Sequence, residues 1–102
     1  MDLVFEAPLS EKAKLLSVLE ADPYGNPSFS RNSYKVKEGS AIGQDNGKIF
    51  VFMRATEEFA SFAREKLKGV AVESSREVAA AVAKAIQEEE NNAEVGFGSI
   101  FG

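Results

Sequence analysis

The chain begins with a hydrophobic pattern typical of one strand followed by one helix. Residues 2–7 are mostly apolar and precede Pro8, which cannot donate a ladder hydrogen bond, so we expect a short strand that ends there. Leucines then recur at helical spacing and predict a helix that buries Leu15 and Leu19. Two prolines and a glycine within residues 22–27 predict that a loop ends this helix.

The middle of the chain has the pattern of a β-hairpin. Residues 29–43 carry strand-forming side chains, and the turn Asp45-Asn46-Gly47 supplies residues that accept a positive φ. Residues 48–55 read Lys-Ile-Phe-Val-Phe-Met-Arg-Ala, the strongest strand pattern in the sequence. Because both faces of this second strand are apolar, we expect it in the centre of a sheet.

Two more helices and a short strand are predicted in the second half of the chain. Thr56 is placed to cap a helix that has Phe59 on its buried face. Residues 70–73 alternate and predict a brief strand. Ser74, with a glutamate three residues later, matches a capping box and begins a last helix that we expect to end near Glu90.

The order strand, helix, strand, strand, helix, short strand, helix predicts an α+β fold. Its first six elements match a ferredoxin-like two-layer sandwich (β-α-β-β-α-β). The last helix would be an addition to that sandwich, followed by a short apolar tail. Residues 1–92 would form a single α+β domain, and residues 93–102 a Gly/Phe-rich C-terminal tail.

Composition restricts the chemistry of the protein, because its 102 residues include no cysteine and no histidine. This argues against thiolate nucleophiles, imidazole acid–base catalysis and the usual zinc sites. The runs Glu57-Glu58 and Glu88-Glu89-Glu90 are adjacent on predicted helices, where neighbouring side chains do not converge on one target. We therefore expect no catalytic, cofactor or metal site, and the protein is not predicted to be an enzyme.

The run Glu88-Glu89-Glu90 opposes the dipole of a helix that ends close to it. We expect these glutamates to form a solvated helix end. An acidic docking surface for a basic partner is the alternative.

Nothing in the sequence predicts a contact with a membrane. The N-terminal segment lacks the basic stretch and long apolar run of a signal peptide. The longest purely apolar run, residues 49–53, is far shorter than the ~20 residues that a membrane helix requires. Since cysteines are also absent, we expect a cytoplasmic protein.

Two apolar features predict contacts with a protein partner or with a second copy of the chain in a homodimer. In a two-layer sandwich the helices cover one sheet face, which would leave Phe50 and Phe52 on the open face. Homodimerisation through the sheet, or cover by the last helix and the tail, would each bury them. The tail carries Phe97, Ile100 and Phe101, which would dock on the domain itself or enter a partner's groove.

A basic patch on the hairpin suggests RNA binding as an alternative. The net charge is −4, but residues 1–54 carry 7 basic and 7 acidic side chains, so the acidic excess belongs to the second half. Cations interleaved with aromatic side chains can hold phosphates and stack bases. Lysines that protect a strand edge from aggregation are the other interpretation. The candidate RNA contacts are Arg31, Tyr34, Lys35, Lys37, Lys48 and Arg54.

Over residues 3–68 the order of elements resembles the small dimerising subunit of the KEOPS complex. The resemblance lies in a strand ending at Phe5-Glu6, a helix followed by Asp22-Pro23, a hairpin, and a last strand that leads to Phe59. It implies a non-catalytic subunit that dimerises and docks by its helices on the ATPase subunit, in the synthesis of threonylcarbamoyladenosine in tRNA. That family ends in one long helix, whereas Gly69 and the Ser74-Ser75 cap interrupt this chain.

Together these patterns favour a non-catalytic α+β protein-interaction module that acts through its sheet face or its tail. The alternative function is an RNA-binding or accessory subunit of a tRNA-modifying complex. Neither interpretation implies a cofactor.

Overall fold

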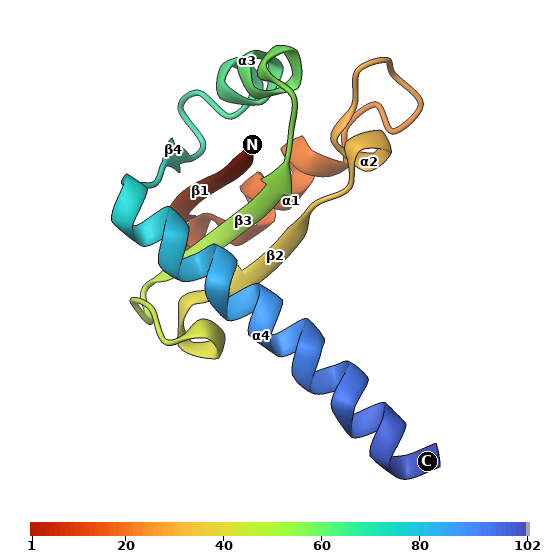
Figure 1. Ribbon diagram of the computed structural model, residues 1–102. Coiled ribbons are helices and arrows are strands. Elements are labelled where there is room, and N and C mark those ends of the chain that lie inside the picture. The colour runs from red at the N-terminus through yellow and green to blue at the C-terminus, as the bar shows by residue number, and fades with distance from the viewer. Residues whose placement is uncertain (102) are drawn as a thin grey trace.

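Within the described residues, four strands of the computed structural model form one antiparallel sheet in the order β2-β3-β1-β4 (Figure 1). The structure describes residues 1–101, and the side chains of residues 1–90. The strands are β1 (Asp2–Pro8), β2 (Lys35–Glu38), β3 (Lys48–Arg54) and β4 (Val72–Glu73). The helices are α1 (Lys12–Glu20), α2 (Phe29–Asn32), α3 (Glu57–Lys66) and α4 (Arg76–Phe101), with short 3₁₀ helices at Leu9–Glu11 and Gly39–Ile42. The α+β class predicted from the sequence is confirmed.

The centre of the sheet is the long pairing between β1 and β3. Asp2 lies opposite Arg54, and the pairing continues without interruption through all seven residues of each strand. β2 extends the sheet along β3, and β4 pairs only with the middle of β1. The predicted central position of the strand over residues 48–55 is therefore confirmed.

Helices α1, α2 and α3 cover one face of the sheet and form with it the first core. Leu15 and Leu19 of α1 are fully buried in one cluster with apolar side chains of β1 and β3. Phe59 of α3 packs edge-on against Phe29 of α2, with the ring centroids 5.6 Å apart and an angle of 87° between the planes. The buried positions predicted for Leu15, Leu19 and Phe59 are confirmed.

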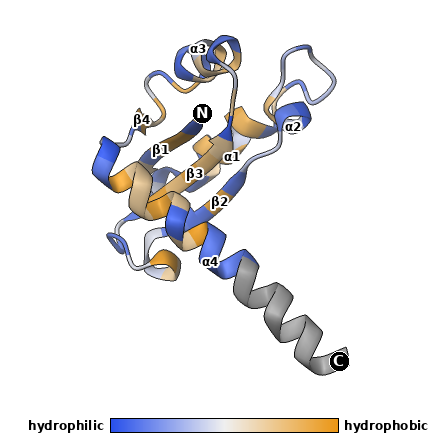
Figure 2. Cartoon of the chain, in the orientation of Figure 1, coloured by the Kyte–Doolittle hydropathy of each residue, from blue (hydrophilic) through white to orange (hydrophobic). Residues whose placement is uncertain are grey.

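Helix α4 covers the other face of the sheet and forms a second core. Val82 and Ile86 are 0% and 2% exposed, and they belong to one cluster with Val4 of β1 and Phe50 and Phe52 of β3. Figure 2 shows hydrophobic residues of α4 along the part of the helix that crosses the sheet. The sheet thus carries helices on both faces, whereas the sequence predicted one open face.

The segment over residues 29–43 is only partly a strand, although its side chains favour one throughout. Ser28 caps the short helix α2, and its Oγ accepts a hydrogen bond from the N–H of Arg31 at 3.2 Å. β2 occupies Lys35–Glu38, and a 3₁₀ helix follows it. A local side-chain cap has therefore outweighed strand propensity, which depends strongly on context.

Helix α4 extends further than the sequence predicted. The expected end lay near Glu90, whereas the helix continues to Phe101. Asparagine is only weakly unfavourable inside a helix, and no proline follows Pro27 to end this one. The predicted tail is therefore helical in its backbone over residues 93–101.

Candidate functional site

The candidate residues of β2 and β3 gather on the sheet face that α4 covers. Residues directly opposite one another on neighbouring strands share a face, and Lys35 lies opposite Phe52 while Lys37 lies opposite Phe50. Alternation along β3 adds its first and last residues to the same face. The predicted site residues on this face are Lys35, Lys37, Lys48, Phe50, Phe52 and Arg54.

The two phenylalanines of β3 are buried, and the prediction that they lie on an open face is wrong. Phe50 and Phe52 have exposed fractions of 2% and 7%. They share a cluster with Val82 and Ile86, so cover by the last helix, one of the two expected arrangements, accounts for them. The physical reason is that α4 carries an apolar stripe of its own, which it buries against the phenylalanines. The structure therefore offers no open sheet surface at these two residues.

Helix α4 also supplies carboxylates to the lysines of β2. Lys37 Nζ lies 2.7 Å from Glu89 Oε1, and Lys35 forms an ion pair with Glu90. The run Glu88-Glu89-Glu90 is exposed, as expected, but it lies inside α4, so the expectation that it ends the helix is wrong. The lysine partner of Glu89 is 52 residues away in the sequence, which is why local pattern did not predict the pairing.

The other two cations of this face are paired with carboxylates of β1. Lys48 Nζ lies 3.1 Å from Glu6 Oε1, and Ser74 Oγ donates a hydrogen bond to Glu6 Oε2 at 2.9 Å. Arg54 Nε lies 3.4 Å from Asp2 Oδ1. Each of the four basic residues on this face therefore has a carboxylate partner in the chain. Such pairing lowers the positive potential that would attract a nucleic acid.

The remaining two RNA candidates, Arg31 and Tyr34, precede β2 and have different surroundings. Arg31 lies in the last turn of α2. Tyr34 packs against the first core and also lines a cavity that it shares with Lys35, Phe52 and Arg54. Partial burial raises the pKa of the Tyr34 phenol, and the nearby carboxylate of Glu20 raises it further. Tyr34 thus contributes packing to the first core.

The raised pKa of Tyr34 predicts a loss of stability at alkaline pH. Its contribution to stability is fully present below the unfolded pKa of about 10 and is lost as the pH rises through the higher folded pKa. We therefore expect Tyr34→Phe to flatten the decline in the free energy of unfolding between about pH 9 and pH 11. Urea denaturation of both proteins across this range measures the effect, and two parallel curves would contradict it.

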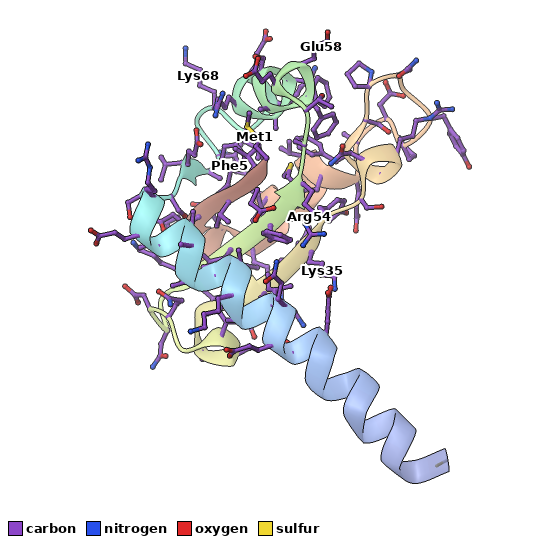
Figure 3. The ribbon with its side chains drawn as sticks, in the orientation of Figure 1. Met1, Phe5, Lys35, Arg54, Glu58 and Lys68 are labelled. Carbon is purple, nitrogen blue, oxygen red and sulfur yellow. The ribbon has the colours of Figure 1, made fainter. Side chains whose placement is uncertain are left out.

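Two cavities lie along the border between α4 and β2, and we call the residues that line them the α4–β2 seam. The larger, of about 210 Å³, is lined by the apolar side chains of Phe52 and Ile86 and by the charged residues Lys35, Arg54 and Glu90. The smaller, of about 130 Å³, is lined by both glutamate–lysine pairs and by Ile86. Figure 3 shows Lys35 and Arg54 near one another beside α4. Packing between α4 and β2 is therefore incomplete, and ion pairs connect the two elements.

Several residues of this seam carry little sequence signal of their position. Asn32 and Gln87 line the larger cavity, and Asn32 Nδ2 donates a hydrogen bond to the carbonyl of Arg54 at 3.0 Å. Glu89 and Glu90 follow Ile86 by three and four residues, which places them on the same side of the helix as a buried residue. That spacing is the one signal in the sequence that could have identified them.

The predicted contact residues of the tail lie outside the residues whose side chains the structure describes. They are Phe97, Ile100 and Phe101, and the backbone of this segment continues α4. The expectation that they dock on the domain or on a partner stays a prediction.

We searched the described residues for metal-binding clusters and for membrane-spanning helices. Over residues 1–90, no three or more carboxylates gather in a way that could hold a metal ion. Among the described helices, none combines the length and the apolar composition that crossing a bilayer requires.

Comparison of the chain with protein-family models, with curated proteins and with solved structures finds no match.

Proposed function

We propose that the protein is a non-catalytic α+β interaction module whose contact element is the C-terminal part of α4, with a second copy of the chain or another protein as its partner. The observation that carries this is the length of α4, which has 26 residues and spans about 39 Å. The longest strands have seven residues and span about 23 Å. A helix of this length exceeds the sheet that it covers, and in Figure 1 it continues past β2.

The first part of α4 is fixed to the domain, so the second part is held in a defined direction. Val82 and Ile86 are buried in the second core. Glu89 and Glu90 add the ion pairs to β2. Residues 91–101 then extend the helix by about 16 Å beyond these pairs. An element that is anchored at one end and directed away from its domain is suited to contact another surface.

The sequence of the second part has the spacing of an apolar helix face. Ala93, Phe97 and Ile100 follow Ile86 by 7, 11 and 14 residues, which gives them nearly the same angular position on an α-helix. The stripe that packs on the sheet at Ile86 is therefore continued in the sequence beyond the sheet. A contiguous apolar stripe of this kind supports a contact with another protein surface.

We also propose that the domain has the ferredoxin-like arrangement. The strand order β2-β3-β1-β4 and the antiparallel pairing of all neighbours support it. Helices α1 and α3 both contribute to the core on one face, as the arrangement requires. A role as accessory subunit of a tRNA-modifying complex rests on the same order of elements and stays a weaker proposal.

Replacing Phe97 and Phe101 together by alanine is expected to abolish self-association while the fold is retained. The change removes two large apolar groups from the contact element, and the described core residues all precede residue 87. Light scattering over a range of concentrations measures the result. We expect the mass of the unmodified protein to rise toward that of a dimer, and the variant to stay monomeric.

Ser99→Ala is the matched control, because Ser99 lies in the same segment and its replacement removes no apolar group. Deletion of residues 93–102 should reproduce the double variant. If the unmodified protein were monomeric at every concentration, and the shortened chain equally stable, the proposed contact would lose its support.

A further inference from the structure

The sheet face under α4 has the composition of a surface that binds single-stranded nucleic acid. Phe50 and Phe52 are alternate residues of β3, so they lie on one face, and Lys37 and Lys35 lie opposite them on β2. Arg54 continues this face at the end of β3. Proteins that bind single strands stack bases on aromatic side chains of a sheet and hold the phosphates with neighbouring cations.

Helix α4 covers this face unevenly. Val82, which belongs to the cluster with Val4 of β1, is 0% exposed, although a cavity of about 390 Å³ lies between Val4 and the first turns of α4. Beside β2 the helix leaves the two further cavities of the α4–β2 seam, and these are the ones that the lysines line. Phe52 lines the larger one together with Lys35 and Arg54. Tyr34 lines it as well, so two aromatic residues and two cations already border a single hollow.

The carboxylates of α4 occupy the positions where phosphates would bind to the lysines. Glu89 pairs with Lys37, and Glu90 pairs with Lys35. The two glutamate side chains are 51% and 49% exposed, so both pairs lie at the surface. Exposed ion pairs contribute little to stability, and a polyanion can compete for the lysines while the core around Val82 stays packed.

We propose that the α4–β2 seam binds a single-stranded nucleic acid, and that Glu89 and Glu90 hold it closed in the free protein. A base enters the larger cavity against Phe52, and backbone phosphates replace the two carboxylates on Lys35 and Lys37. The outer end of α4 moves away from β2 to admit the strand. This site is separate from the proposed protein contact, which uses residues beyond Glu90.

The seam favours a single-stranded nucleic acid over other polyanions because it combines cations with apolar and aromatic side chains. An acidic peptide would satisfy the lysines but would leave Phe52 and Ile86 without a matching group. A double helix would contact the cations only, since its bases are stacked and cannot enter a cavity of about 210 Å³. These two ligands therefore serve as discriminating probes.

The test replaces Glu89 and Glu90 together by glutamine, which removes the internal competitors and preserves side-chain size. Binding of a fluorescently labelled short oligouridine is followed by anisotropy at several salt concentrations. We expect about tenfold tighter binding than for the unmodified protein at low salt. The slope of log K against log salt should also steepen, because in the unmodified protein the two displaced glutamates take up cations and so offset part of the counterion release.

Glu65→Gln with Glu88→Gln is the matched control, because it changes the net charge equally. Both carboxylates are exposed, and neither takes part in an ion pair among the described residues. We expect this control to bind oligouridine as weakly as the unmodified protein. Adding Lys35→Ala and Lys37→Ala to the Glu89/Glu90 variant should remove its gain. Far-UV circular dichroism verifies that each variant is folded.

The proposal is overturned if the Glu89/Glu90 variant binds oligouridine no more tightly than the matched control. It is equally overturned if a polyglutamate peptide or an RNA duplex binds that variant as tightly as the single strand. All of these variants leave residues 91–102 unchanged. The result is therefore independent of the light-scattering test of the protein contact.

Discussion

Replacing Phe50 by alanine is expected to lower the free energy of unfolding by about 3–5 kcal/mol. Phe50 is 2% exposed and lies in the second core, between β3 and α4. Removal of its ring leaves a cavity under the helix, and the loss combines the hydrophobic transfer energy with the cost of that cavity. A domain of this size is stable by roughly 5–15 kcal/mol, so the variant would lose a large part of its stability.

Urea denaturation followed by far-UV circular dichroism measures this loss. Tyr24→Ala is a suitable control, because Tyr24 is 88% exposed and its replacement should change stability by less than about 0.5 kcal/mol. If Phe50→Ala were as mild as this control, α4 would not cover β3 in solution. The result thus tests the feature that most distinguishes the structure from the open two-layer sandwich.

Phe50 and Phe52 also show how far hydrophobic pattern predicts a fold. Both faces of residues 48–55 are apolar, and this correctly predicted a central strand. The same pattern could not predict which element covers each face. Periodicity records that a face is buried, whereas the covering partner depends on how distant segments pack. The cover by α4 is therefore a tertiary property.

Element boundaries were missed where local chemistry competes with propensity. Ser28 caps α2 inside a stretch whose side chains favour a strand. In α4 the two asparagines after Glu90 suggested an end, yet the helix continues. Propensities differ by less than about 1 kcal/mol per residue for such positions, so context decides the outcome.

The candidate site was predicted in part, because its residues are close in sequence but their partners are not. Lys35, Lys37 and Arg54 were expected together on the hairpin, and they do share one face of the sheet. Their carboxylate partners come from β1 and from α4, far along the chain. Because these carboxylates are distant in the sequence, no periodic pattern of residues could predict that they pair with the basic residues of the hairpin.

The ion pairs between α4 and β2 explain how the basic and acidic residues are distributed along the chain. The second half of the chain carries the acidic excess, and the hairpin carries most of the basic residues of the first half. α4 brings Glu89 and Glu90 of the acidic half onto the lysines of β2. A net charge of −4 therefore does not describe the seam itself, where two lysines are paired with two carboxylates.

Gly39→Ala is expected to be the second strongly destabilising substitution, at about 3 kcal/mol. Gly39 begins the 3₁₀ helix between β2 and β3. A Cβ at this position would overlap the backbone carbonyl of Asp45 and approach that of Lys48 to 3.2 Å. Backbone atoms cannot rotate away as a flexible side chain can. The connection that leads into β3 must therefore shift, and denaturation in urea measures the cost.

Gly43→Ala is the control that separates steric overlap from backbone strain. It makes the same substitution four residues later, in the same connection between β2 and β3. Gly43 has a φ of +70°, and a Cβ there would meet no atom within 4 Å. Only the left-handed backbone conformation is penalised, which costs roughly 1–2 kcal/mol. A loss for Gly39→Ala that did not exceed this value would contradict the close approach of Gly39 to the turn at Asp45. A larger loss would show that this packing determines where β3 begins, and with it the position of Phe50 under α4.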